Sequence, residues 1–207
     1  QRAPTFKAEK RADSRHQNKS ISKNNPLSTE ANIAVVVLAA GGSTRLGHPK
    51  QLVEFKGKTL LEHTLGQVGM LGFQHRVLVL GSRHEEIQGK IDTSGFKVVI
   101  NDDWEQGMAS SIKLGLKAAM AEEALDHALF LVSDQPFLER VNLIKLVHTQ
   151  LTKKPNATYS KYGNNIGVPA IFGKTAFPLL LQLDGDEGAK KLIHSKDFDY
   201  CTEAFQK

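Results

Sequence analysis

The sequence predicts an α/β protein, a three-layer α/β/α sandwich around a mostly parallel sheet. Three observations predict this class. Short apolar, β-branched runs alternate with segments of helical period, the first run is apolar at every position, and a glycine-rich loop follows it. Alternating strands and helices are typical of a parallel sheet that is covered on both faces. In such a sheet, ligand-binding loops lie at the carboxyl ends of the strands.

The expected elements follow one another along the chain. The first strand, Ile33–Ala39, is short, continuous and β-branched, as a strand buried on both faces should be. Thr59 and Glu62 form a T-x-x-E capping box before a helix that runs to about residue 70. Further strands are expected at 76–80, 96–100, 128–132, 157–160 and 168–172, helices at 110–122 and 143–151, and two short helices near the C-terminus.

The first 31 residues differ in composition from the rest of the chain. They carry seven Lys or Arg and three acidic residues, a net charge of +4 within a total of +5. They hold few apolar residues and show no sustained period, which predicts a disordered basic tail or linker over 1–31 and one domain over 32–207. A tag remnant fits a chain that begins with Gln. A transit peptide is an open alternative, although no amphipathic face is evident.

Composition also argues against several classes of protein. Because the excess of basic residues lies in the tail, nucleic-acid binding by the domain is not expected. No apolar run approaches the ~18–20 residues that span a membrane. The lone cysteine, Cys201, cannot form an internal disulfide, and no secretion signal is evident, so a cytoplasmic location is expected. No zinc-hydrolase or serine-elbow motif occurs, and His63 and His148 are expected to be partly buried structural groups.

The loop after the first strand is expected to bind phosphates. It reads LAAGGSTRLGHPK from Leu38 to Lys50. Its small residues let backbone N–H groups approach a phosphate chain, while Arg45 and Lys50 add a guanidinium fork and a point charge. A Walker loop fails because His48 and Pro49 follow Gly47, and the dinucleotide spacing is not met either, which disfavours a nicotinamide or flavin oxidoreductase. A generic glycine-rich turn is the alternative.

Three later segments hold further candidate residues. Asp134, in Ser-Asp-Gln-Pro after the strand at 128–132, offers a carboxylate for Mg²⁺, although Asp before Pro is also common in turns. In the segment from Asn101 to Ile112, Gly107 allows close approach of the backbone and the serines at 110 and 111 begin a helix that can donate to an anion. Ser110 as a simple helix cap is the alternative, and Trp104 is expected in the core. Asp186 is a second acidic candidate, or the N-cap of the final helix.

The pattern Leu-Ala-Ala-Gly-x-Ser-x-Arg-Leu-Gly-x-x-Lys resembles the signature of the MobA-like NTP transferase family, and more narrowly that of the molybdenum cofactor cytidylyltransferases. The resemblance covers nearly all of residues 33–195, with the motifs in the family's order. It implies a Rossmann-like fold of the nucleotide-diphospho-sugar transferase type. It also implies Mg²⁺-dependent transfer of CMP from CTP to molybdopterin, with release of pyrophosphate and transient contact with a molybdenum hydroxylase. Ala40 favours CTP, because guanylyl-transferring relatives carry Gly there.

The resemblance also implies roles for individual residues. The catalytic residues are Arg45, Lys50 and Asp134, and the metal ligands are Asp134 and Asp186. The nucleotide-binding residues are Leu38, Ala39, Ala40, Gly41, Gly42, Ser43, Lys50, Gly107, Ser110 and Ser111. The acceptor-binding residues are Gln135, Pro169, Asp186 and Lys190. Val168 stands where many relatives carry His or Asn, and Lys190 replaces Arg, which leaves the identity of the acceptor open.

Two other functions stay open on the sequence alone. A nucleotidyltransferase that acts on a sugar or alcohol phosphate would share the first loop, although the segments around Asp134 and Asp186 resemble it less. A non-catalytic carrier of molybdenum cofactor would bind without turnover. The combination of Arg45, Lys50 and Asp134 argues against the carrier.

Overall fold

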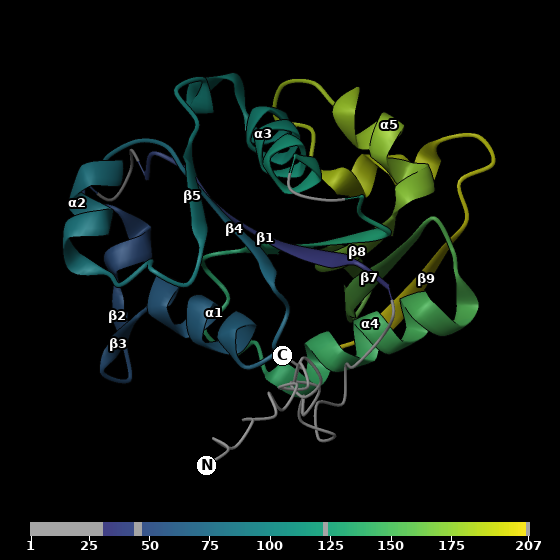
Figure 1. Cartoon of the computed structure of the whole chain (residues 1–207), viewed down its shortest axis with the longest axis horizontal. Helices are drawn as coiled ribbons and strands as arrows, with labels where there is room; N and C mark the ends of the chain where they lie inside the picture. Colours follow the sequence, from purple (N-terminus) through teal and green to yellow (C-terminus); the bar gives the residue numbers. More distant parts are fainter. Residues whose placement is uncertain (1–30, 44–46, 122–123, 206–207) are drawn as a thin grey trace, which may run out of the picture.

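The computed structural model describes residues 31–43, 47–121 and 124–205 of the chain. Within them, a central sheet is covered by helices on both faces, so the expected three layers are confirmed (Figure 1). The tail expected over 1–31 lies outside the described residues, except for Ala31, and so does Arg45.

Seven strands form the sheet, in the order β5-β4-β1-β6-β8-β7-β9. They are β1 (Ile33–Ala39), β4 (His75–Leu80), β5 (Lys97–Ile100), β6 (His127–Val132), β7 (Ala157–Tyr162), β8 (Asn165–Gly173) and β9 (Tyr200–Ala204). The helices are α1 (Leu60–Gly69), α2 (His84–Lys90), α3 (Met108–Met120), α4 (Arg140–Lys153) and α5 (Phe177–Leu181). A small hairpin joins β2 (Glu54–Phe55) to β3 (Lys58–Thr59).

The sheet is mostly parallel, as expected. β1 pairs in parallel with β4 and β6, and β4 pairs in parallel with β5. β8 is antiparallel to both β6 and β7, and β9 runs parallel to β7 at the edge. The carboxyl ends of β1 and β6 therefore lie side by side at one edge of the sheet, directly before the glycine-rich loop and the Ser-Asp-Gln-Pro segment.

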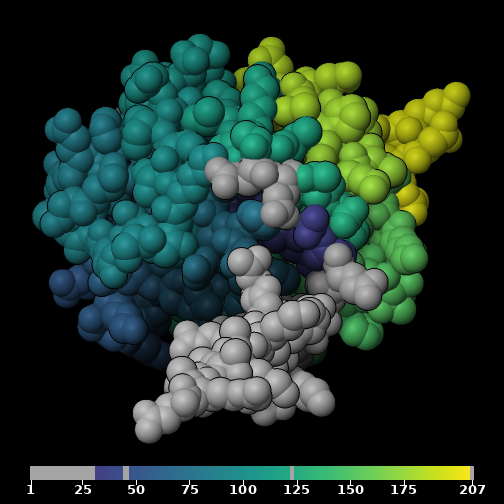
Figure 2. Space-filling view, in the orientation of Figure 1, coloured from purple at the N-terminus to yellow at the C-terminus, as the bar shows by residue number. Residues whose placement is uncertain are grey.

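Two hydrophobic cores fill the space between the layers. All seven residues of β1 are buried, and they alternate between the two faces. Val36 faces the core under α3 and α5, whereas Val37 faces the core under α1 and α4 (Figure 1). α3 packs very close to the sheet at Gly115. A Cβ at this position would come within 2.5 Å of Val36 Cγ1, so the close packing depends on glycine. In the space-filling view, the green-to-yellow C-terminal part of the chain packs directly beside the teal α3 (Figure 2).

Several elements differ from the expectation. α3 begins at Met108 rather than at residue 110, and its N-cap is Gly107. The interpretation of Ser110 as a helix cap is therefore wrong. The two short C-terminal helices are α5 and a 3₁₀ helix, η4 (Ala189–His194), whose N-cap is Gly188, so Asp186 is not a helix cap. α2, the β2–β3 hairpin and β9 were not expected.

The expected capping box at α1 is present. Glu62 N donates to Thr59 Oγ1 over 3.2 Å, and Thr59 N donates to Glu62 Oε2 over 2.7 Å. The hydrogen bond from the Thr59 backbone lowers the pKa of Glu62. Both donors belong to the N-terminus of the helix, where no intrahelical partner exists.

Thr59→Ala is expected to lower the free energy of unfolding by about 1 kcal/mol, because it removes the side-chain acceptor of this cap. Urea denaturation at neutral pH measures the loss. Thr59→Ala keeps the backbone hydrogen bond to Glu62 but removes the one that Thr59 Oγ1 donates to Glu62 Oε2 over 2.7 Å, which is the second cause of the lowered pKa. The stability from this side-chain hydrogen bond is present above the ordinary pKa of a glutamate and is lost as the pH falls through the lowered folded-state value. The difference between the wild type and Thr59→Ala should therefore shrink in acid, and a difference that grows there contradicts the account.

Candidate active site

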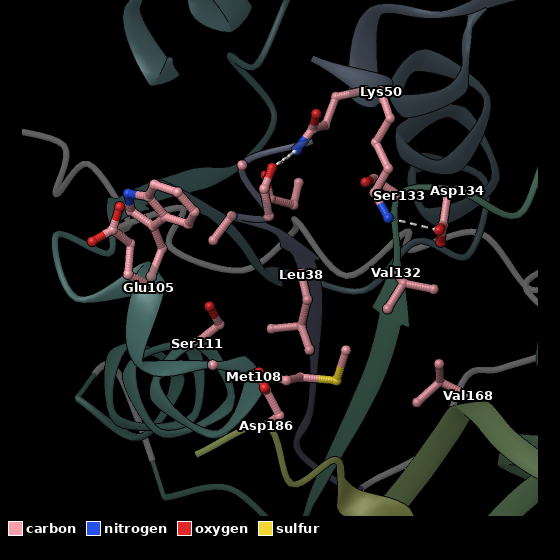
Figure 3. A pocket seen from close by; sticks show the side chains of 17 residues that line it. Leu38, Lys50, Glu105, Met108, Ser111, Val132, Ser133, Asp134, Val168 and Asp186 are labelled. Carbon is pink, nitrogen blue, oxygen red and sulfur yellow. Dashed lines mark hydrogen bonds and ion pairs between the residues drawn. The ribbon is translucent and has the colours of Figure 1, made fainter. Parts of the chain in front are cut away.

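A cavity of about 520 Å³ opens at the carboxyl ends of β1 and β6 (Figure 3). The first loop and the 3₁₀ helix η1 (Lys50–Leu52) form one wall, and the 3₁₀ helix η2 (Trp104–Gln106) with the start of α3 forms another. The lining residues are Leu38, Ala39, Ala40, Gly41, Gly42, Lys50, Gln51, Trp104, Glu105, Gly107, Met108, Ser111, Val132, Ser133, Asp134, Val168 and Asp186. A volume of this size suits a small-molecule substrate.

The loop that follows β1 folds back onto η1 through side-chain hydrogen bonds. Lys50 N donates to Ser43 Oγ over 2.9 Å, and Ser43 has a φ of +50°. The Gln51 amide donates to Ala39 O over 2.7 Å and to Gly41 O over 3.1 Å. These contacts tie both ends of the segment from residue 39 to 43 to one short helix.

Lys50 and Asp134 form an ion pair at the mouth of the cavity. Lys50 Nζ lies 2.8 Å from Asp134 Oδ2, and each side chain is 39% exposed (Figure 3). An ion pair this exposed contributes at most about 1 kcal/mol to folding. The pair matters more for chemistry than for folding. It sets an ammonium group suited to phosphate beside a carboxylate suited to a divalent cation.

The start of α3 forms the opposite wall, where a buried asparagine orders two hydroxyl groups. Asn101 Nδ2 donates to Ser110 Oγ over 2.8 Å and to Ser111 Oγ over 2.9 Å. Ser110 Oγ donates in turn to Gly107 O over 2.8 Å. Of the two serines, Ser111 lines the cavity. Its hydroxyl, which accepts from Asn101, is therefore placed to donate to a ligand.

Asp186 enters the cavity because its loop docks onto the start of α3. Ala109 N donates to Gly185 O over 3.1 Å. A Cβ on Gly107 would come within 2.4 Å of the Gly185 backbone, so only glycine permits this approach. In the close view, Asp186 and Asp134 lie on different sides of the cavity (Figure 3). Within the described part of the chain, no group of three or more His, Cys, Asp or Glu side chains is arranged to hold a metal ion.

The cavity brings together most of the residues expected in the site. Those on its wall are Leu38, Ala39, Ala40, Gly41, Gly42, Lys50, Gly107, Ser111, Asp134 and Asp186. Ser43 and Ser110 do not line the cavity, but each accepts a hydrogen bond from a neighbouring residue, Ser43 from Lys50 N and Ser110 from Asn101 Nδ2. The close backbone approach expected at Gly107 is made with Gly185 of the same chain.

Three of the residues expected to bind the acceptor do not line the cavity. Gln135 Nε2 donates to Val168 O over 2.8 Å and to Tyr162 Oη over 3.2 Å, and burial raises the pKa of Tyr162. Pro169 is buried within β8, and Lys190 is exposed on η4. Val168, which departs from the family pattern, supplies an apolar side chain to the cavity instead.

Several wall residues were not expected. Val132 and Ser133 precede Asp134 directly, and Gln51 follows Lys50, so their neighbours in sequence were the available signal. Met108 follows Gly107 directly and carried the same signal, whereas Glu105 is adjacent to no residue expected in the site. Trp104 packs against the core as expected, but its ring also lies against Gly42, where a Cβ would come within 2.4 Å of it.

The two histidines expected to be structural differ from each other. His63 is half-buried, and its Nε2 lies 2.6 Å from Phe55 O. His148 is exposed on α4, so the expectation that it is partly buried is wrong. Neither lines the cavity.

Comparisons with known proteins identify the class. The model of the MobA-like NTP transferase domain matches residues 35–199. The chain belongs to this family, and its enzyme class is that of a nucleotidyltransferase. No helix in the described ranges is both long and apolar enough to cross a membrane.

Individual relatives cover most of the chain. Nicotine blue oxidoreductase of Paenarthrobacter nicotinovorans is 27% identical over 172 residues, which is 78% of this chain and 81% of that protein. Purine catabolism protein PucB of Bacillus subtilis is 30% identical over 167 residues, 77% of this chain and 80% of that protein. The chain also matches GlmU of Mycobacterium marinum, but it spans only 25% of that bifunctional protein.

Solved structures agree with the fold. The crystal structure of Rv0371c from Mycobacterium tuberculosis superposes with a TM-score of 0.77 and 31% identity, covering 86% of this chain and 90% of that one. A second structure of Rv0371c is a complex with manganese, with a TM-score of 0.73 and 28% identity.

Proposed function

We propose that this protein transfers CMP from CTP to molybdopterin in a Mg²⁺-dependent reaction that releases pyrophosphate. The observation that carries the proposal is the 2.8 Å contact between Lys50 Nζ and Asp134 Oδ2 at the mouth of the cavity. It brings together an ammonium group suited to phosphate and a carboxylate suited to a divalent cation, at the edge of the sheet where a glycine-rich loop begins. Membership of the MobA-like NTP transferase family supports the same reaction class.

In the proposed reaction, an oxygen of the acceptor phosphate forms a bond to the α-phosphorus of CTP. The bond from this phosphorus to the bridging oxygen breaks, and pyrophosphate leaves with its electron pair. No general base is needed, because a phosphate monoester is already ionised near neutral pH. Lys50 neutralises phosphate charge, and the loop from residue 39 to 43 holds the polyphosphate by its backbone N–H groups.

The residues present fit a divalent cation that is held partly by substrate. Mg²⁺ commonly binds through one or two carboxylates together with phosphate oxygens and water. Asp134 and Asp186 are carboxylates on the cavity wall, the number that such a shared site requires. When bound, the ion neutralises charge between two anionic substrates. The manganese complex of Rv0371c supports a divalent cation in the related protein.

Ala40 is proposed to help select the base. Its side chain is buried, and Gly81 lies so close that a Cβ on Gly81 would come within 2.9 Å of Ala40 Cβ. Ala40→Gly removes a methyl group from the wall and should shift the ratio of kcat/KM for CTP over GTP toward GTP by about tenfold, the scale of one methyl group in a pocket. Binding of inorganic tripolyphosphate, which has no base, should not change. An unchanged ratio shows that Ala40 does not select the nucleotide.

Pyrophosphate release tests the proposed function directly. The assay combines the protein, Mg²⁺ and molybdopterin with CTP, GTP, ATP or UTP in parallel. Release with CTP supports the proposal. A second set of reactions contains a sugar or alcohol phosphate in place of molybdopterin. Release only in that set shows that the acceptor is a sugar or alcohol phosphate. Tight CTP binding without any product supports a carrier.

A second candidate function rests on the name of one relative. Nicotine blue oxidoreductase is similar over 78% of this chain, and its name indicates a redox reaction. Reductase activity is therefore the second function to test. Oxidation of NADH or NADPH with a quinoid dye as acceptor, in the absence of any NTP, would support that function. No oxidation, together with pyrophosphate release, supports nucleotidyl transfer.

A further inference from the structure

Gln51, the middle residue of η1, is fully buried, and its side chain faces the loop that follows β1. Its Nε2 donates to Ala39 O over 2.7 Å and to Gly41 O over 3.1 Å. We infer that Gln51 is a positioning residue that sets the direction of the loop's backbone N–H groups toward phosphate. The inference rests on the proposed function, because it assigns the loop to a polyphosphate.

Peptide geometry connects the two hydrogen bonds to the N–H groups. In a trans peptide, the N–H points away from the preceding C=O within one plane. The cis bond in the described residues is Val168–Pro169, so the peptides of the loop are trans. Ala39 O and Gly41 O both face the Gln51 amide, and the N–H groups of Ala40 and Gly42 therefore point away from it. One side chain thus directs two donors of the cavity wall to the same side.

The orientation of the amide is fixed by its partners. Both partners are carbonyl oxygens, so only the NH₂ end of the glutamine can face them. The other end, Oε1, is buried and has no hydrogen-bond partner among the described atoms. Gln150, another fully buried glutamine, satisfies both ends, with Nε2 donating to Pro155 O over 2.8 Å and Oε1 accepting from Thr158 Oγ1 over 2.8 Å.

A second side chain also contacts the loop. The ring of Trp104 lies so close to Gly42 that a Cβ there would come within 2.4 Å of it. The loop is therefore held by the indole as well as by the Gln51 amide. Donors that are held in place before binding lose little freedom when a phosphate arrives, which strengthens the interaction.

Gln51→Met and Gln150→Met test the inference as a matched pair. Each removes a fully buried amide and keeps a side chain of similar length, but only the first touches the loop. Binding of tripolyphosphate and of CTP, each with Mg²⁺, is followed by the fluorescence of Trp104, which is the one tryptophan of the chain, and by calorimetry. Thermal unfolding reports the structural cost of each substitution.

Gln51→Met should weaken tripolyphosphate binding about tenfold or more, the scale of one hydrogen bond to a charged group. The KM for CTP should rise by a similar factor while kcat changes less, because the contacts with the phosphates exist before the chemical step. Gln150→Met should lower the unfolding temperature but bind both ligands as the wild type does.

Each outcome is decisive. If Gln51→Met binds tripolyphosphate as tightly as the wild type does, the inference is overturned, while turnover by the wild type leaves the proposed function standing. If the wild type binds tripolyphosphate but releases no pyrophosphate with any acceptor, the proposed function fails and the binding ratio still decides the role of Gln51. A wild type that binds no polyphosphate overturns both.

Discussion

Asp134→Ala is expected to reduce kcat for nucleotidyl transfer by about 100- to 1000-fold, the loss that follows removal of one preorganised electrostatic group. The variant removes the carboxylate that faces Lys50 at the cavity mouth, and with it the proposed principal ligand of Mg²⁺. Affinity for Mn²⁺, measured in the presence of CTP, should fall together with kcat. The fold should persist, because the side chain is 39% exposed and its ion pair contributes little to stability.

Asp126→Ala is the matched control for this variant. Asp126 precedes β6 as Asp134 follows it, and it also pairs with an exposed lysine, since Lys174 Nζ lies 3.2 Å from Asp126 Oδ1. It lies at the opposite end of the strand from the cavity. Full activity in Asp126→Ala with loss in Asp134→Ala assigns the effect to the site. Normal activity in a well-folded Asp134→Ala would refute the metal role.

Strands buried on both faces were the easiest part of the fold to predict. β1 matches the expected Ile33–Ala39, because no position of that run can face water. The missed elements have weak patterns. α2 buries only Ile87 among its seven residues, so it shows no apolar stripe. β9 has no fully buried residue and owes its place to parallel pairing with β7, a long-range contact that leaves no local signal.

The candidate site was predictable where its residues lie on segments that leave neighbouring strand ends. Lys50 and Asp134 come 84 positions apart. The parallel pairing of β1 with β6 brings their segments to one edge of the sheet, and the fold of the loop onto η1 brings Lys50 the rest of the way. The contacts of Gln51 with the loop and of Val168 with the cavity depend on the orientation of their side chains. The spacing of residues in the sequence does not encode this orientation. Lys190 stands where the family motif has Arg, but η4 holds it on an exposed surface that does not line the cavity.

Gly107→Ala is the other substitution with a large expected effect. Gly107 has a φ of +99°, which disfavours any residue with a Cβ, and the added carbon would meet Gly185 C and O at 2.4 Å. Both contacts are backbone, so no flexible side chain can move aside. The loop that carries Asp186, the start of α3 that carries Ser111, or both must shift. A displacement of about 1 Å in a substrate-positioning segment can reduce turnover about 100-fold, and a loss of this size in kcat/KM for CTP is expected.

Gly188→Ala separates this effect from a general intolerance of the loop to side chains. Gly188 has a φ of −84°, which any residue adopts, and its Cβ would meet Met108 Sδ at an ordinary 3.5 Å. We expect it to keep kcat/KM within about twofold of the wild type, since the contact needs no movement of the backbone. Thermal unfolding of both variants checks that they are folded at the assay temperature. If Gly107→Ala is as active as Gly188→Ala, the docking of Gly185 on α3 does not position Asp186 for the reaction. If it loses activity while its unfolding temperature stays close to that of the control, the loss lies in the geometry of the site, because a global loss of structure would lower both.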